Sequence, residues 1–244
     1  MHKRNVLRKI AIKTLAYATI ASILIAMHYR KHSLLISGLL FAVLATARAN
    51  LDEQTYDKVV ASKPAVGDIV FTRIGGPIFS RVAVTTQSWT SHVGIIVDYQ
   101  LGDWIVAESG VPRVRKTPLR KFLGHSEDQE FAIMRLKNEP TGEEKRAMLR
   151  IADSQLGKFY SLGFDLQSRK TFCSKFVHDV VFESTHQSIG EIETFDQLLH
   201  GNPDAPLAFW RTWFFGFIPW QRTTITPASE LVSPSLKIVI QNHV

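Results

Sequence analysis

Cys173 is the only cysteine of the 244-residue chain, and it is the residue with the clearest chemical potential. One thiol cannot form an intramolecular disulfide or supply a multi-cysteine zinc site, so any role it has is that of a thiol. Apolar residues at helical spacing predict a helix over 171–184 with Thr171 as its N-cap. A helix start lowers the pKa of a cysteine, and the free N–H groups there can hold an oxyanion. The alternative is a buried cysteine that only fills the core.

A nucleophilic cysteine needs a base, and the base needs a group that orients it. Of the six histidines after residue 50, His178 and His186 share the helix of the cysteine, but neither stands three or four residues from it. His125 lies in a polar loop, whereas His92 opens an apolar, strand-like run. A lone histidine at a strand edge is more often structural than catalytic, so its neighbours decide the matter.

The predicted neighbour of His92 is Glu108. Two β-rich runs, 91–99 and 103–109, flank a short glycine-containing link and predict a hairpin. If the hairpin folds about Gln100–Leu101, paired residue numbers sum to 200–202, and His92 and Glu108 lie about 4.5–8 Å apart at Cβ. Glu108 stands in an otherwise apolar strand, where an acid needs a partner. A carboxylate at this place would orient the imidazole and complete a Cys–His–Glu set.

The remaining elements predict an α+β domain rather than a doubly wound parallel sheet, because strands and helices are partly segregated. Thr141 and Glu144 form a capping box that opens a helix running towards Gly157. Residues 50–64 are polar and predict a short helix or linker. Further strands are expected at 66–73, 130–136 and 236–240.

An aromatic stretch occupies 209–220, where seven of twelve residues are aromatic. Trp210, Trp213, Phe214 and Phe217 would share one face of a helix. We expect these rings to close the core over the sheet. The alternatives are a wall for an apolar or acyl part of a substrate, or a contact with the membrane surface.

The excess positive charge of the chain is confined to its N-terminal end. Residues 1–50 hold eight Lys and Arg residues and no acid, whereas residues 51–244 hold 21 basic and 22 acidic residues. This nearly neutral body argues against nucleic-acid binding, which needs a basic surface.

Residues 1–49 have the pattern of a leader with two apolar stretches, 10–27 and 34–47. The second follows a basic flank and ends in Ala47-Arg48-Ala49, which is typical of a secretory signal peptide. Met27 stands just upstream, so a product that starts at Met27 rather than Met1 would carry a complete signal peptide. We therefore expect the protein to be exported, periplasmic or secreted, after cleavage near Ala49. The alternative is a membrane anchor formed by 10–27.

Four motifs in this order resemble the permuted NlpC-type, papain-like cysteine hydrolases, and within them the YiiX/YebB-like branch, most of all YebB. They are Gly67-Asp-Ile-Val-Phe71, Ser91-His-Val-Gly-Ile-Ile96, Ala107-Glu-Ser109 and Phe172-Cys-Ser-Lys-Phe-Val177, and segments 190–195, 218–220 and 226–229 are also similar. The resemblance spans roughly 64–240. It implies a circularly permuted papain-like α+β domain over 50–244, with an antiparallel sheet packed on helices.

The resemblance also implies roles for single residues. Cys173 would be the nucleophile, His92 the base and Glu108 the polar third member. Tyr160, in the loop before the helix of the nucleophile, and Ser174 would contact the substrate or the oxyanion. The alternative for Tyr160 is a buried loop aromatic.

Together these observations predict an exported cysteine hydrolase that cleaves a cell-wall peptide or another small amide through an acyl-enzyme. One alternative is a lipid acyl hydrolase or acyltransferase with the same triad, and another is a binding module without activity. No metal or organic cofactor is expected, because the sequence has no H-E-x-x-H, P-loop or G-x-G-x-x-G motif. The sequence leaves the exact substrate and the oligomeric state open.

Overall fold

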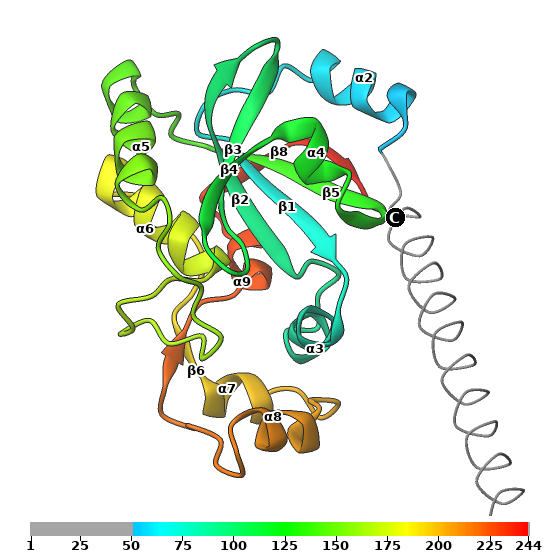
Figure 1. The fold of residues 1–244 in the computed structure, drawn as a ribbon, viewed down its shortest axis with the longest axis vertical. Coiled ribbons are helices and arrows are strands. Elements are labelled where there is room, and N and C mark those ends of the chain that lie inside the picture. Colours follow the sequence, from blue (N-terminus) through cyan, green and yellow to red (C-terminus); the bar gives the residue numbers. More distant parts are fainter. Residues whose placement is uncertain (1–50, 244) are drawn as a thin grey trace, which may run out of the picture. The chain divides into compact units, whose positions relative to one another are not determined.

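The centre of the structure, a computed structural model that describes residues 51–243, is a six-stranded antiparallel sheet (Figure 1). Its strand order is β4-β3-β2-β1-β5-β8. The antiparallel pairing and the separate helices confirm the predicted α+β class. The strands are β1 (Ile69–Ile74), β2 (His92–Gln100), β3 (Asp103–Ser109), β4 (Val114–Pro118), β5 (Ser126–Leu136) and β8 (Leu236–Asn242).

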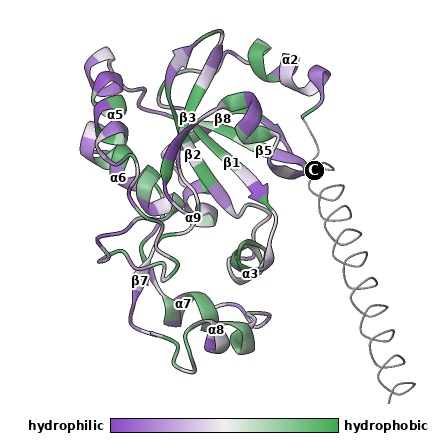
Figure 2. Cartoon of the chain, viewed as in Figure 1, coloured by the Kyte–Doolittle hydropathy of each residue, from purple (hydrophilic) through white to green (hydrophobic). Residues whose placement is uncertain are grey.

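Helices cover both faces of this sheet. Residues of α5 (Gly142–Ser154) and α6 (Cys173–Thr185) pack on one face, and residues of α2 (Glu53–Ala61) and α4 (Leu119–Leu123) pack on the other. The central strands are therefore buried on both sides, and they form continuous apolar runs rather than an alternation. Figure 2 shows these hydrophobic residues running along β1 and β2.

A third hydrophobic cluster lies beside the sheet and is largely aromatic. It joins the loop before α6 to α7 (Phe195–His200) and α8 (Leu207–Trp213), with α3 (Pro77–Thr85) against it. The other short elements are β6 (Glu193–Thr194), β7 (Thr223–Thr224) and α9 (Pro227–Leu231). Cys173 begins α6, so its surroundings include both the core under the sheet and this cluster.

The third cluster contains five of the seven rings of the stretch 209–220, namely Phe209, Trp210, Trp213, Phe214 and Trp220. The prediction that the stretch closes the core over the sheet is therefore wrong. The shared helical face is wrong as well. Helix α8 ends at Trp213, and Phe217 lies beyond it with its side chain exposed. Trp210 is buried, and its indole N–H donates to Thr85 Oγ1 at 2.7 Å.

The structure confirms some predicted ends of elements and corrects others. The Thr141–Glu144 capping box is present at the start of α5, and β8 closes the sheet as expected. Thr171 is not the N-cap of α6; Phe172 holds that position and offers no side-chain acceptor. Helices α3 and α4 and strand β4 are not among the predicted elements.

The predicted leader 1–49 lies outside the described residues. Among residues 51–243, no helix combines the length and the apolar character needed to cross a membrane.

Candidate active site

The β2–β3 hairpin positions His92 relative to Glu108. Its turn consists of Leu101 and Gly102, both with positive φ, so Gln100 pairs with Asp103 and paired numbers sum to 203. With that register throughout, His92 and Glu108 would point to opposite faces of the sheet. A β-bulge between Ile96 and Asp98 shifts the sum to 202 in the inner half of the hairpin. The bulge therefore brings both side chains to the same face.

Close packing fixes the His92 side chain. Gly94 is the next residue on its face, and a Cβ there would lie 2.5 Å from a methyl group of Val106 and 3.1 Å from the Phe122 ring. The Phe122 ring instead stacks at a tilt on the His92 ring, with 5.5 Å between centroids. Glycine at 94 is thus a requirement of the close approach that holds the imidazole.

The predicted contact between His92 and Glu108 is present. His92 Nε2 lies 2.7 Å from Glu108 Oε2, and the two residues are only 3% and 2% exposed. The other carboxylate oxygen accepts hydrogen bonds from Thr117 Oγ1 at 2.7 Å and from Arg115 Nε at 3.0 Å. Burial alone would raise the pKa of Glu108, but His92, Thr117 and Arg115 lower it to about 2. Glu108 is therefore a carboxylate at any physiological pH.

The pKa of the His92 ring lies well above its usual range, so the ring stays protonated at neutral pH. Burial disfavours its charged form, but hydrogen bonding and charge interactions with Cys173 and Glu108 raise the pKa of His92 to about 9. With Nε2 bound to Glu108, Nδ1 has no conventional hydrogen-bond partner among residues 51–243. Nδ1 is thus the nitrogen left for the thiol.

Cys173 is the first residue of α6 and is 4% exposed. Because Phe172 caps no backbone group, the first N–H groups of α6 are not occupied by a capping side chain. Burial raises the pKa of the Cys173 thiol, but His92, the Tyr160 hydroxyl and the backbone N–H of Ser174 outweigh it and lower that pKa. The geometry favours a thiolate beside an imidazolium.

The Tyr160 side chain lies next to Cys173, as predicted, but the Ser174 side chain does not have the predicted role. The Tyr160 hydroxyl lies 3.9 Å from Cys173 Sγ, and burial and the cysteine charge raise its pKa, so it remains a donor. The Ser174 hydroxyl donates to the Ile225 carbonyl at 2.8 Å and is not free to bind an oxyanion. Only the backbone N–H of Ser174 faces the sulfur.

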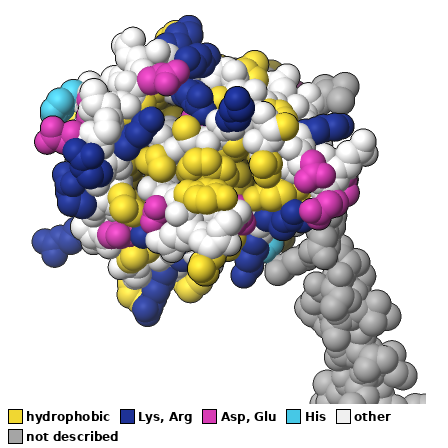
Figure 3. Space-filling view, turned by 90° about the horizontal axis from the view of Figure 1, so that it is seen from above, with side chains coloured by type: hydrophobic (Ala, Val, Ile, Leu, Met, Phe, Trp, Pro, Cys, Tyr) yellow, Lys and Arg dark blue, Asp and Glu magenta, His cyan; other side chains and the backbone are white. Residues whose placement is uncertain are grey.

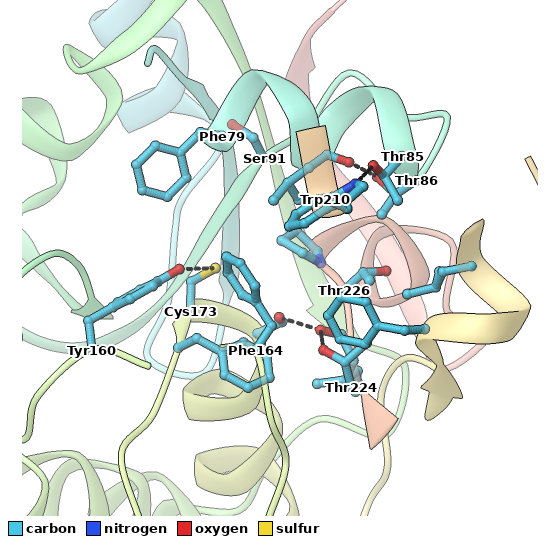
Figure 4. Close-up of a pocket in the computed structure, with 17 residues that line it drawn as sticks. Phe79, Thr85, Thr86, Ser91, Tyr160, Phe164, Cys173, Trp210, Thr224 and Thr226 are labelled. Atoms are coloured by element: carbon cyan, nitrogen blue, oxygen red, sulfur yellow. Dashed lines mark hydrogen bonds between the residues drawn. The ribbon is translucent and has the colours of Figure 1, made fainter. Parts of the chain in front are cut away.

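A small cavity of about 40 Å³ opens beside Cys173 (Figure 4). In Figure 4 the Tyr160 hydroxyl points at the sulfur, and the Phe164 and Trp210 rings lie across the cavity. Its wall is mostly aromatic and aliphatic, with hydroxyl groups of threonine and serine at intervals. The apolar lining is Phe79, Val82, Phe164, Phe172, Phe195, Leu198, Trp210, Ile225 and Pro227.

Comparison with known proteins agrees with this geometry. A family model described as permuted papain-like amidase enzyme, YaeF/YiiX, C92 family, matches residues 63–240. The chain belongs to this family. A curated relative, the uncharacterized protein YiiX of Escherichia coli K12, is 23% identical over 179 residues, which are 73% of this chain and 87% of YiiX.

A solved member shows the same fold as this C92-family chain. The crystal structure of yiiX from Escherichia coli O157:H7, described as a metalloprotein, superposes with a TM-score of 0.69 at 24% identity. The superposition covers 75% of this chain and 99% of the yiiX chain. The predicted YiiX-like branch and permuted papain-like fold are confirmed, while a special similarity to YebB stays a prediction.

Two residues that the sequence analysis missed complete the surroundings of Glu108 in this family member. Arg115 and Thr117 belong to β4, and Arg115 pairs directly with Glu108 across β3 and β4. The available signal is a short run that contains the β-branched residues Val114 and Thr117, after a glycine and a proline. It was too short to stand out from a loop.

Proposed function

We propose that the protein is a cysteine hydrolase of the amidase type in which Cys173, His92 and Glu108 act as a triad. The observation that carries this proposal is the 2.7 Å contact between buried His92 and Glu108, which leaves the other imidazole nitrogen for the thiol at the start of α6. Base, orienting acid and nucleophile are the three parts that acyl transfer needs. Membership in an amidase family supports the same reaction class.

In the first step the Cys173 thiolate attacks the carbonyl carbon of an amide. An S–C bond forms and the carbonyl electron pair moves to oxygen. As the tetrahedral intermediate collapses, the C–N bond breaks and the imidazolium of His92 gives its proton to the departing nitrogen. The products of this step are a free amine and a thioester on Cys173.

Stabilisation of the oxyanion would come from the start of α6 and from Tyr160. The uncapped N–H groups of α6 carry partial positive charge, and the Ser174 N–H already faces the sulfur. The Tyr160 hydroxyl, which stays protonated, is a second donor at 3.9 Å from Sγ.

In the second step His92, now neutral, accepts a proton from a water molecule that attacks the thioester carbonyl. The S–C bond breaks, the carboxylic acid leaves and the thiolate is restored beside a protonated imidazole. Glu108 keeps its negative charge throughout, and it holds the ring so that Nδ1 can serve both steps.

The description of YiiX as a metalloprotein raises the question whether this chain holds a metal. Within residues 51–243, His, Cys, Asp and Glu side chains nowhere gather in a group of three or more that could bind one. Both carboxylate oxygens of Glu108 are already engaged by His92, Arg115 and Thr117. These residues do not fit a metal centre, and the proposed mechanism takes no step through one.

A second candidate, a lipid acyl hydrolase or acyltransferase on the same triad, is favoured by the lining of the cavity beside Cys173. Its aromatic and aliphatic wall suits an apolar acyl group better than a charged cell-wall peptide. For this candidate, the bond that breaks is an ester or amide bond of a fatty acid. Water, an alcohol or an amine then accepts the acyl group from the thioester on Cys173.

Intact-mass analysis of the same protein with two kinds of substrate tests both candidate functions. We would incubate the full chain with short peptide amides or with long-chain N-acyl amides and look for an acyl adduct on Cys173 and for the released amine. Adduct and turnover that disappear in Cys173→Ala and fall sharply in His92→Ala support the hydrolase, and the preferred acyl group separates the candidates. If no substrate of either kind acylates Cys173, and Cys173 reacts like a free thiol, the protein is a binding module and the proposal fails.

A further inference from the structure

The turn after α8 exposes aromatic rings, although the residues on either side of it are packed. Phe215 is 100% and Phe217 75% exposed, while Trp210 and Ile218 nearby are buried. We call residues 213–217 the aromatic turn. Together with Leu162 and Pro219, the aromatic turn lines a shallow apolar hollow on the surface.

The backbone conformation and hydrogen bonds of the aromatic turn fix its rings in these exposed positions. Phe215 has φ of 54° and Gly216 has φ of 98°, both in the left-handed region, which is unusual for a bulky side chain such as Phe. The Trp213 indole N–H donates to the Leu162 carbonyl at 3.0 Å, and the Phe215 N–H donates to the Thr212 carbonyl. The turn thus presents two phenyl rings on a fixed support, an arrangement that costs strain and gains no internal packing.

The charged side chains of the segment that contains the aromatic turn are all basic. Residues 205–222 contain Arg211 and Arg222 and no acidic residue. Arg211 is exposed, and Arg222 lies over the Phe214 ring at 5.3 Å, donates to the Gly163 carbonyl and faces Asp165 at 3.8 Å. Aromatic rings flanked by arginine match the boundary between the acyl chains and the anionic headgroups of a bilayer.

The opposite end of the molecule provides a contrast. Figure 3 looks at the end away from α8, where hydrophobic side chains also gather, but with both basic and acidic side chains around them. The β2–β3 turn with fully exposed Leu101 lies at that end. Leu101 also has a positive φ of 52°, so an exposed apolar side chain on a left-handed residue is not special in this protein. The aromatic turn differs in that two exposed rings lie together in a segment whose only charged side chains are arginines.

We propose that the aromatic turn docks on the surface of an anionic lipid bilayer, with Phe215 and Phe217 entering the headgroup boundary. Two exposed phenyl rings and their rim are too few to form a stable protein–protein interface, which needs about 800 Å² per partner. A bilayer contact needs only a few such rings, and it is weak and reversible unless a second signal reinforces it.

Docking at the aromatic turn affects the cavity beside Cys173, because one cluster of rings lines both this cavity and the surface hollow. Phe172, next to Cys173, contacts Phe164, which contacts Trp210, which contacts Phe214 of the aromatic turn, with centroids 5.8, 6.2 and 6.0 Å apart. Trp210 lines the cavity and Phe214 lines the surface hollow. The contact therefore seats the bilayer against the same cluster that forms the cavity wall.

A local probe tests the contact in the full chain, where any lipid binding by residues 1–50 is common to all samples. Cys173 is the only cysteine, so Cys173→Ala with Phe215→Cys allows labelling with an environment-sensitive NBD dye at the aromatic turn. The matched control is Cys173→Ala with Leu101→Cys, labelled in the same way. Vesicles of phosphatidylcholine with phosphatidylglycerol, vesicles of phosphatidylcholine alone, and buffer are compared at low and high salt.

We expect the dye at 215 to shift to the blue and to brighten several-fold with anionic vesicles, less with zwitterionic ones, and less at high salt. The dye at 101 should not respond. Equal responses at 215 and 101, or no response at 215, would overturn the proposal. A response at 215 that grows with protein concentration without lipid would also overturn it, because it would assign the surface to a second copy of the chain.

Discussion

The carboxylate of Glu108 accepts hydrogen bonds from His92, Arg115 and Thr117, so its negative charge is fixed beside the imidazole. This environment explains why two opposite pKa shifts occur together. The pKa of His92 rises to about 9 because Cys173 and Glu108 stabilise its charge, and His92 in turn helps to lower the pKa of Glu108 to about 2. The same protonated ring then favours the thiolate of Cys173.

Glu108→Gln keeps the shape of the side chain and removes its charge. We expect kcat to fall by about two to four orders of magnitude, because the amide neither stabilises the imidazolium nor selects the right tautomer. Near-ultraviolet circular dichroism should show that the fold is retained. Arg115→Gln serves as the control and should lose far less activity, since Thr117 and His92 still hold the carboxylate. Near-full activity of Glu108→Gln would reduce the site to a dyad.

Tyr160→Phe removes the hydroxyl that lies 3.9 Å from Cys173 Sγ. If this hydroxyl stabilises the oxyanion, kcat should fall about 10²-fold while KM changes little. Tyr99→Phe, an exposed tyrosine on β2, is the control and should behave as the wild type. A loss confined to KM would instead make Tyr160 a binding residue.

At the scale of elements, the hairpin shows what the sequence could and could not predict. Both strands and the pairing sum of 202 near His92 agree with the prediction, but the actual turn sets a sum of 203. Only the bulge at Val97 restores the predicted register, and nothing in the local sequence marks it. The capping box of α5 was readable because it is local, whereas the contacts of β4 with Glu108 depend on tertiary pairing.

The support that β4 gives to Glu108 can be measured with Thr117→Val, which removes one buried hydrogen bond to a charged group. We expect the free energy of unfolding at neutral pH to fall by about 1.5–3 kcal/mol. Glu108 has a lowered folded pKa, so its stabilisation is complete above its unfolded value of about 4.5 and is lost as pH falls towards about 2. The deficit of Thr117→Val should therefore shrink in acid.

Urea unfolding at several pH values measures this deficit. Thr212→Val is the control, because that exposed hydroxyl bonds only to the Ala208 carbonyl of its own helix. Its effect should stay within about 0.5 kcal/mol at every pH. A deficit of Thr117→Val that does not depend on pH would mean that Thr117 acts through packing and not through Glu108.

At the scale of the whole molecule, charge divides the chain into a basic N-terminal part and a nearly neutral remainder. The described residues 51–243 form the domain with the candidate site, and the permuted papain-like family model falls within them. The aromatic cluster beside the sheet could not be predicted from helical periodicity, because α8 ends before its pattern does and the packing comes from distant segments.

The basic N-terminal part of the chain predicts that the protein is exported. We propose that the mature chain begins near Asn50, because Ala47-Arg48-Ala49 has the small residues that signal peptidase recognises. N-terminal sequencing of the protein from its native host measures this directly, and Ala49→Tyr should slow the cleavage. An intact Met1 in the membrane fraction would show that residues 10–27 serve as an anchor instead.

The pH dependence of Cys173 alkylation is the most direct test of the proposed triad. Iodoacetamide reacts with the thiolate, so the midpoint of the rate–pH profile reports the pKa of Cys173. We predict a midpoint well below the free-thiol value of about 8.5 in the wild type, and a clearly higher one in His92→Ala, where burial acts without the imidazolium. His178→Ala, in the same helix, should match the wild type. Midpoints near 8.5 in both the wild type and His92→Ala would contradict a Cys173–His92 pair.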